Sequence, residues 1–267
     1  MTELFQYDFF TNALIAALLA SVSCGIIGTY IVARRMVFIG GGITHASFGG
    51  IGIAYFLGLN PILGAAVFAV LSAFGINYFT HKGNIRQDSS IAIWWSLGMA
   101  IGIIFISLTP GYAPNLMSFL FGSILTVTQS DLIFMGTISF LVVLLFIFFF
   151  RLVMMIAFDE EFARARNLPV NLFNYLLMAL SALAIVASIR VSGVILVLSL
   201  LTLPQATANL FTKKFKSIMI ASILIGFAGM LSGLFLSYYT DMPSGATIIL
   251  VLTTFFGLGK AGILFKQ

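Results

Sequence analysis

Long apolar runs separated by short polar stretches make up almost the whole chain. A helix needs about 20 mostly apolar residues to cross the hydrocarbon core of a bilayer. The pattern therefore predicts an all-α, polytopic transmembrane helical bundle with about nine spans, within a range of eight to ten. The predicted spans are Thr11–Ala33, Phe38–Gly58, Ile62–Thr80, Ser89–Leu108, Leu132–Phe150, Leu172–Ile189, Gly193–Phe211, Ile218–Leu236 and Ala246–Leu258.

The stretch Thr109–Ser130 makes the number of spans uncertain. Pro110, Gly111 and Pro114 interrupt it, yet Leu116–Val127 is apolar. A run of about 12 residues is too short to span a bilayer and suits an interfacial or re-entrant helix. If this run did cross, the orientation of every later span would invert.

Basic residues predict the orientation. The first run follows an acidic stretch and precedes Arg34 and Arg35, which is unlike a cleaved signal peptide. A retained first helix and nine spans place the N-terminus outside and the C-terminus in the cytoplasm. Twelve of the 13 Lys and Arg residues then fall on the cytoplasmic side, and only Arg190 falls outside. This agrees with the positive-inside rule.

Composition narrows the class of protein. The chain is 61% hydrophobic and 8% charged, whereas soluble domains carry about 25% charged residues. This excludes a water-soluble enzyme, a disordered chain and a nucleic-acid binder. Cys24 is the single cysteine, so a disulfide framework is excluded as well. Motifs of the types G-x-x-x-x-G-K-[ST], H-E-x-x-H and G-x-S-x-G are absent, so we predict a membrane conduit that is not itself an enzyme.

One histidine falls in the middle of a predicted span. His45 lies in the glycine-rich segment Gly40–Gly50, ten residues after Arg35, or about 15 Å along a helix. Its imidazole could bind a metal ion or relay protons, or it could be hydrogen-bonded to a neighbouring helix. Thr44 and Ser47 beside it are candidate pathway residues. Zinc usually takes about four ligands, so His45 would need partners from elsewhere.

A charged segment at residues 158–169 connects two spans on the predicted cytoplasmic side. Asp159 can cap a short helix in which acidic residues come first and basic residues follow, as the helix dipole favours. The apolar residues among them favour a docking element over a solvated loop. The residues of this element are Asp159, Glu160, Glu161, Phe162, Ala163, Arg164 and Arg166.

Two prolines mark further candidate positions. Pro204 lies inside a span, where it frees a backbone carbonyl and predicts a kink beside protein or a water-lined cavity. Asp241 precedes Pro243 at a helix start, and Asp241 or Ser244 is expected to cap that helix. We include Pro204 and Asp241 among the candidate pathway or gating residues.

Taken together, these motifs resemble the permease subunit of the bacterial ABC importers for zinc, manganese and iron. The likeness runs from Gly28 to the C-terminus, and the motifs occur in the family's order. They are Arg34-Arg35, the segment around His45-Ala46-Ser47, Asn115–Ser123, Asp159–Pro169, Val191-Ser192-Gly193-Val194 with Pro204–Ala208, and Asp241–Thr247.

The resemblance implies a homodimeric permease in the bacterial inner membrane. The chain length predicts that residues 1–267 form a single transmembrane domain. Two cytoplasmic ATP-binding-cassette ATPase subunits and an external metal-binding protein would be its partners, besides membrane lipid. Asp159–Pro169 would be the coupling helix that docks into the ATPase. Alternating access along the dimer axis would carry the ion, and no permanently bound cofactor is implied.

Position 41 departs from the family. Many members carry an Asp four residues before the histidine, and here that residue is Gly41. Imidazole without carboxylates suits zinc better than manganese. The sequence therefore favours zinc as cargo, then iron or manganese, with His45 as a weak, transient ligand. Gln205 after Pro204 also departs from the family's more common Ala.

Two other functions stay open. A stand-alone secondary metal transporter or channel would usually carry more ionisable groups inside its spans than this chain does. A permease for a metal chelate such as haem or a siderophore belongs to the same class, but related chelate permeases are usually longer.

Overall fold

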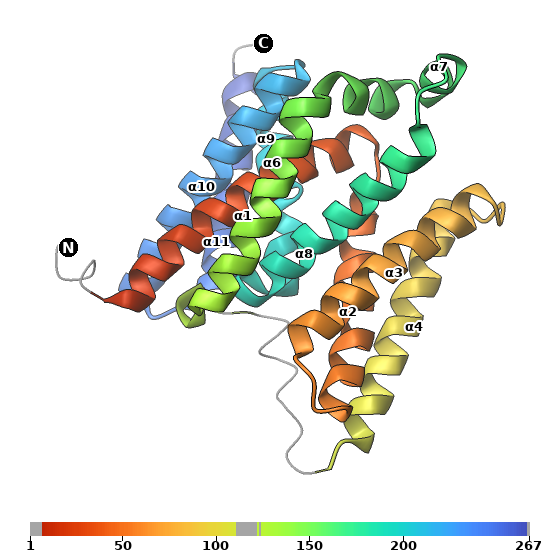
Figure 1. The fold of residues 1–267 in the computed structure, drawn as a ribbon. Coiled ribbons are helices and arrows are strands. Elements are labelled where there is room, and N and C mark those ends of the chain that lie inside the picture. Colours follow the sequence, from red (N-terminus) through yellow and green to blue (C-terminus); the bar gives the residue numbers. More distant parts are fainter. Residues whose placement is uncertain (1–6, 111–121, 123, 266–267) are drawn as a thin grey trace. The chain divides into compact units, whose positions relative to one another are not determined.

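The computed structural model describes residues 7–110, 122 and 124–265. Within these residues the chain is helical, without a strand (Figure 1). The helices are α1 (Asp8–Ala33), α2 (Val37–Phe56), α3 (Pro61–His81), α4 (Gln87–Leu108), η2 (Ile124–Thr126), α6 (Gln129–Phe158), α7 (Glu160–Ala165), α8 (Val170–Leu200), α9 (Leu203–Phe211), α10 (Phe215–Thr240) and α11 (Ser244–Leu264).

Nine helical stretches in the described part of the chain are long and apolar enough to cross a membrane. Seven are whole helices, and the other two are Val170–Ile189 and Ser192–Phe211, which meet near Gly193. Gly193 has φ 68°, a left-handed value that ends one helical stretch and starts the next. The predicted all-α bundle with nine spans is thus confirmed, while the orientation of the termini stays a prediction.

α6 differs most from the predicted ranges. The sequence pattern ended this span at Phe150, before Arg151, but the helix continues to Phe158 with a local break at Phe149. A single arginine does not stop a helix in a membrane, because its long side chain can reach the interface. Arg151 is exposed in the structure.

The region between α4 and α6 is described only in part. The predicted helix at Leu116–Val127 and the motif Asn115–Ser123 lie mostly outside the described residues. Ile124–Thr126 form one turn of 3₁₀-helix.

The chain divides into two compact units. The first contains Met1–Val37, Met117–Leu144 and Ala187–Gln267, and the second contains Phe38–Leu116 and Leu145–Val186. In the first unit, α1 packs against α10, and α9 packs against both α10 and α11. Hydrogen bonds tie α1 to its surroundings: the Asn12 amide donates to the Val127 carbonyl oxygen (3.3 Å) and the Ser139 hydroxyl donates to the Leu19 carbonyl oxygen (3.1 Å).

Glycines bring the helices of the second unit into close contact. A Cβ at Gly50 of α2 would overlap the carbonyl group of Gly64 in α3, and one at Gly98 of α4 would overlap the backbone of Ala46. Small residues permit this backbone approach between membrane helices. α2 is accordingly the most buried of the candidate spans in the described chain.

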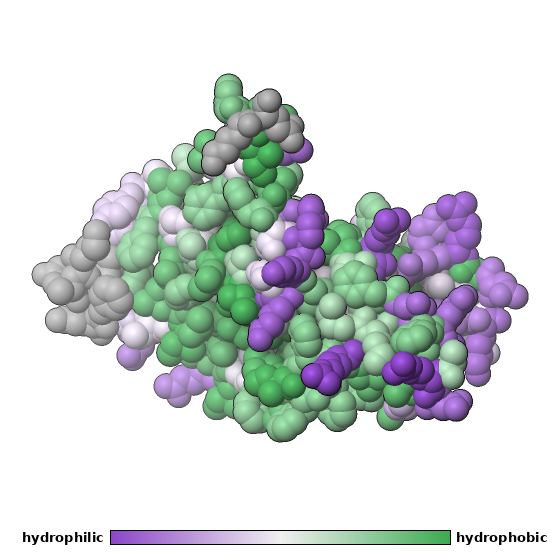
Figure 2. All heavy atoms as spheres, turned by 90° about the horizontal axis from the view of Figure 1, so that it is seen from above, coloured by the Kyte–Doolittle hydropathy of each residue, from purple (hydrophilic) through white to green (hydrophobic). Residues whose placement is uncertain are grey.

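Hydrophobic side chains cover much of the face shown in Figure 2. Several spans leave most of their side chains uncovered by protein, α4 and α11 above all. Exposed leucines, isoleucines and phenylalanines are what a lipid-facing helix surface requires.

Candidate functional site

His45 lies on α2 and stacks against an indole of the neighbouring helix. The ring centroids of His45 and Trp95 of α4 are 4.3 Å apart, and the ring planes differ by 4°. The imidazole Nδ1 is buried and has no hydrogen-bond partner in the described structure. The side chain as a whole is only half-buried, so its accessible part is not Nδ1. Within the described residues, Nδ1 of this imidazole is therefore not engaged in a hydrogen bond.

Thr44 and Ser47 flank the histidine on the same helix and are fully buried. The Thr44 hydroxyl donates to the Gly40 carbonyl oxygen, and the Ser47 hydroxyl donates to the Thr44 carbonyl oxygen (2.6 Å). Both hydroxyl protons are therefore bound to the backbone of α2. Only the oxygen lone pairs of these residues remain for a cation.

A preformed metal cluster is not found in the described residues. They contain no group of three or more His, Cys, Asp or Glu side chains that could hold an ion. Gly41 is buried and offers no side chain in place of a carboxylate. The described residues therefore supply one ligand of the predicted metal site, the imidazole of His45.

Pro204 stands at the first turn of α9, directly after the break that ends α8 at Leu200. The kink predicted from Pro204 is present. The Gln205 amide Nε2 donates to the carbonyl oxygens of Leu200 (3.2 Å) and of Cys24 in α1 (2.9 Å). Gln205 is fully buried, and the absence of a side chain at Gly28 makes room for its amide group. The glutamine thus satisfies a carbonyl at the break and joins the break to α1.

Asp241 serves a different role from the predicted one. It has φ 53° and is the C-cap of α10, and its backbone N–H donates to the Ser237 carbonyl oxygen. α11 begins after Pro243 without a side-chain cap. The expectation that Asp241 or Ser244 caps α11 is wrong, because Asp241 ends α10 in a left-handed conformation and Pro243, whose side chain has no oxygen, occupies the N-cap position of α11.

The helix α7 forms as the charge pattern predicts. The Asp159 carboxylate accepts a hydrogen bond from the Phe162 N–H (2.9 Å), and Arg164 forms an ion pair with Glu160 (2.7 Å). Glu160 also accepts from the side-chain amide of Asn174 in α8 (3.2 Å). The Glu160 side chain is therefore part of an internal brace.

Apolar contacts hold the other side of α7. Ala163 is buried with Ile156 of α6 and with Val170 and Phe173 of α8. Phe162 remains 46% exposed, and the Arg166 guanidinium lies over its ring at 4.8 Å from the centroid. α7 is thus anchored through one face and presents the other, which carries Phe162 with the exposed Glu161 and Arg166.

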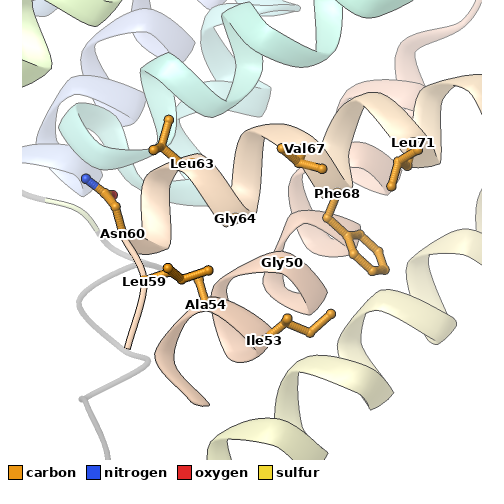
Figure 3. A pocket seen from close by; sticks show the side chains of 10 residues that line it. All are labelled: Gly50, Ile53, Ala54, Leu59, Asn60, Leu63, Gly64, Val67, Phe68 and Leu71. Carbon is orange, nitrogen blue, oxygen red and sulfur yellow. The ribbon is translucent and has the colours of Figure 1, made fainter. Parts of the chain in front are cut away.

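An apolar cavity of about 370 Å³ lies between α2 and α3 in the second unit (Figure 3). Leucine, valine and phenylalanine side chains of α3 line one side, and Ile53 and Ala54 of α2 line the other. Asn60 is the polar residue of the lining, and its side-chain oxygen already caps α3 at Ile62. A cavity with this lining does not suit a metal ion, which needs oxygen, nitrogen or sulfur ligands.

The candidate residues fall into separate parts of the fold. Thr44, His45, Ser47 and α7 belong to the second unit, whereas Pro204 and Asp241 belong to the first. The sequence interpretation missed the roles of Trp95 and Asn174, and it noted Gln205 without an explanation for it. Trp95 could have been noticed as one of two adjacent tryptophans in a largely aliphatic span; Gln205 and Asn174 are polar residues in apolar surroundings.

In the part of the chain that the structure describes, nine candidate spans, the imidazole of His45 within one of them and an anchored polar helix are features expected of a membrane-spanning transporter subunit. Residues 6–261 match the model of the ABC 3 transport family, and the chain belongs to this family. The predicted resemblance is confirmed. Proteins of this class are membrane components of transporters and not enzymes, and ATP hydrolysis is the task of a separate subunit.

Similar proteins cover nearly the whole chain. An uncharacterized membrane protein of Synechocystis is 41% identical over 251 residues, which are 94% of this chain and 89% of that protein. A manganese transport system membrane protein of Halalkalibacterium halodurans is 34% identical, with 99% and 92% covered. These relatives agree with a multi-pass membrane protein of the bacterial inner membrane.

Solved structures agree with the fold. The PsaBC structure from Streptococcus pneumoniae, determined in complex with Fab, contains a chain with a TM-score of 0.85 and 34% identity, covering 96% of this chain and 92% of that one. An inward-facing ABC transporter of the metal-chelate type gives a TM-score of 0.76 at 18% identity, with 95% and 86% covered. The second similarity concerns the fold alone.

Proposed function

We propose that the chain is the permease subunit of an ATP-driven importer for a divalent transition-metal ion, with residues 1–267 acting as one permease domain. The observation that carries the proposal is His45, a partly accessible imidazole in the most buried of the described spans, whose buried Nδ1 has no hydrogen-bond partner among the described residues. Polar groups inside a membrane are costly and are usually retained for function. Family membership supports the same reading.

Manganese is the cargo that we propose to test first. A relative covering nearly all of the chain carries a manganese name, and zinc, which the missing carboxylate at Gly41 favoured, gains no support from such names. Mn²⁺ accepts carbonyl and water oxygens as ligands, so one imidazole with water and backbone oxygens is a workable transient site. Zinc and iron are the competitors in the test.

We further propose that α7 is the coupling helix that contacts the ATPase. The face with Glu160 and Ala163 packs against α6 and α8 of the same chain. Phe162 and its exposed neighbours are therefore free to contact the ATPase. A charge swap of Glu160 and Arg164 would disrupt the brace to Asn174 as well as the surface. Phe162 is therefore a better position to test docking.

Two copies of the chain, two ATPase subunits and an external metal-binding protein complete the proposed importer. One imidazole is a poor metal site by itself, and a symmetric pair would offer two. Alternating access along the dimer axis would expose this pair first outside and then inside.

Uptake of labelled Mn²⁺ tests the proposal. The complete transporter would be expressed in bacteria that lack their own manganese importers, together with His45→Ala and His81→Ala variants. His45 and His81 are the two histidines of the chain, so the second variant is a matched control. We expect uptake by the wild type and the control, and at least a severalfold loss with His45→Ala.

Other outcomes would favour the alternatives. Uptake that persists without the ATPase subunit would indicate a stand-alone transporter. Uptake of a haem or siderophore complex in preference to free Mn²⁺, Zn²⁺ and Fe²⁺ would indicate a chelate permease.

A further inference from the structure

We propose that Trp95 is a positioning residue for the transported ion: its indole fixes the plane of the His45 imidazole, so that the ring presents the same accessible edge in every transport cycle. The inference rests on the proposed function, in which a metal ion contacts His45. It assigns a role to a residue of α4 that the sequence did not point to.

The α2 side of the contact is a stripe of small residues with the histidine in its centre. Gly42, His45, Ala46 and Gly49 are spaced by three, four and seven residues, which places them on one face of a helix. Gly42, Ala46 and Gly49 are buried. His45 is the one long side chain among them.

The α4 side has a matching stripe formed by Ile91, Trp95, Gly98 and Gly102, at intervals of four, seven and eleven residues. Successive residues of this α4 stripe contact successive residues of α2, both counted from the N-terminal end. The two helices therefore run parallel with a fixed register. The pairs are Gly42 with Ile91, His45 with Trp95, Ala46 with Gly98, and Phe48 and Gly49 with Gly102.

Backbone contact on the far side of the ring pair prevents the two helices from sliding. A Cβ at Gly98 or Gly102 would overlap carbonyl groups of α2, so the helices already touch through their backbones there. The side chain of Ile91 lies against Gly42 on the other side. His45 and Trp95 are thus held between two fixed contacts.

The indole takes the place of the hydrogen bond that usually orients a metal-binding histidine. Such a histidine normally donates its second ring N–H to a carboxylate, carbonyl or water, which fixes the ring. His45 Nδ1 has no such partner in the described structure. The Trp95 ring at 4.3 Å is nearly parallel, whereas the Phe48 ring is 6.5 Å away and tilted by 23°. Trp95 is therefore the main contact that sets the plane of the imidazole.

Transport efficiency separates positioning from a structural role. The complete complex with its ATPase and metal-binding protein would be reconstituted in liposomes, and Mn²⁺ transported per ATP hydrolysed would be measured. For Trp95→Leu we expect this ratio to fall by about two- to tenfold, the range that corresponds to losing one aromatic pair. Trp95→Phe keeps a flat ring and should restore most of the ratio.

Two comparisons make the test specific. Trp94 packs over Gly75 of α3, whereas the ring stacked on His45 is that of Trp95, so Trp94→Leu is the matched control and should leave the ratio unchanged. In a His45→Ala background, Trp95→Leu should have no additional effect, because its action passes through the imidazole. The proposal would be overturned if Trp95→Leu lowered the transport ratio as much in the His45→Ala background as in the wild type. It would also be overturned if Trp95→Leu alone gave the wild-type ratio.

A spectroscopic measurement covers variants that transport poorly. With both histidines isotopically labelled, the stacked indole should shift the His45 ring protons in the NMR spectrum, and His81 serves as the internal reference. Trp95→Leu should remove this shift, as should Trp95→Met if the leucine variant fails to accumulate. A His45 signal that does not move refutes the stack. A wild-type complex that transports no Mn²⁺ instead overturns the proposed function and the positioning role with it.

Discussion

Truncating Phe162 to alanine should weaken the binding of the ATPase subunit. Phe162 is 46% exposed on the outer face of α7, and an aromatic side chain buries about 200 Å² when it is covered completely. Covering the exposed part would remove about 90 Å² from water, which at about 25 cal/mol per Å² is worth about 2 kcal/mol. A loss of this size corresponds to roughly 30-fold weaker binding.

The assay is the affinity of the detergent-solubilised permease for its purified ATPase subunit, measured by biolayer interferometry. Phe211→Ala is the matched control, because Phe211 is 67% exposed at the end of α9 and lies outside α7. We expect the control to bind like the wild type. If Phe162→Ala also binds like the wild type, α7 does not dock through this face and the reasoning fails.

Three further substitutions test the contacts that hold the fold. Gln205→Ala removes two buried hydrogen bonds and should lower stability by about 1–3 kcal/mol, seen as a Tm lower by several degrees; an unchanged Tm would contradict the role of the amide. Gly98→Ala places a methyl group against the Ala46 backbone and should cost about 1–3 kcal/mol, whereas Gly257→Ala meets open space within α11 and should not lower the Tm in the same thermal assay. Asp159→Ala removes the cap of α7 at a cost of about 1 kcal/mol and should speed amide hydrogen exchange in its first turn about fivefold; equal exchange rates would show that the cap is dispensable.

Hydropathy predicted the number of spans because the bilayer leaves the backbone few alternatives. Without water to bond to, each crossing segment must satisfy its own N–H and C=O groups, and a helix does this within one segment. The number of apolar runs is then the number of helices. The exact ends follow less directly, as the continuation of α6 past Arg151 shows.

Local charge patterns were also reliable where the partners are close in sequence. The cap by Asp159 and the pair of Glu160 with Arg164 involve residues three and four positions apart, and one helical turn brings them together. Asp241 shows the limit: its backbone adopts a left-handed conformation that the sequence pattern did not specify.

Contacts between distant helices could not be predicted in the same way. Nothing in the spacing of α2 and α4 says that Trp95 rather than Trp94 meets His45, since both tryptophans occur in one apolar span. Gln205 likewise appeared as an unexplained departure until Cys24 and Leu200 supplied its acceptors. Which faces of two helices meet is determined by three-dimensional packing.

The double attachment of α7 has a mechanical consequence. The short helix is fastened to the end of α6 and the start of α8 by Ala163 and its apolar neighbours, and again by Glu160 and Asn174. A load applied at Phe162 would therefore be transmitted to the ends of both long helices together, with little compliance in between. A displacement of α7 would therefore act on α6 and α8 together rather than on one of them alone.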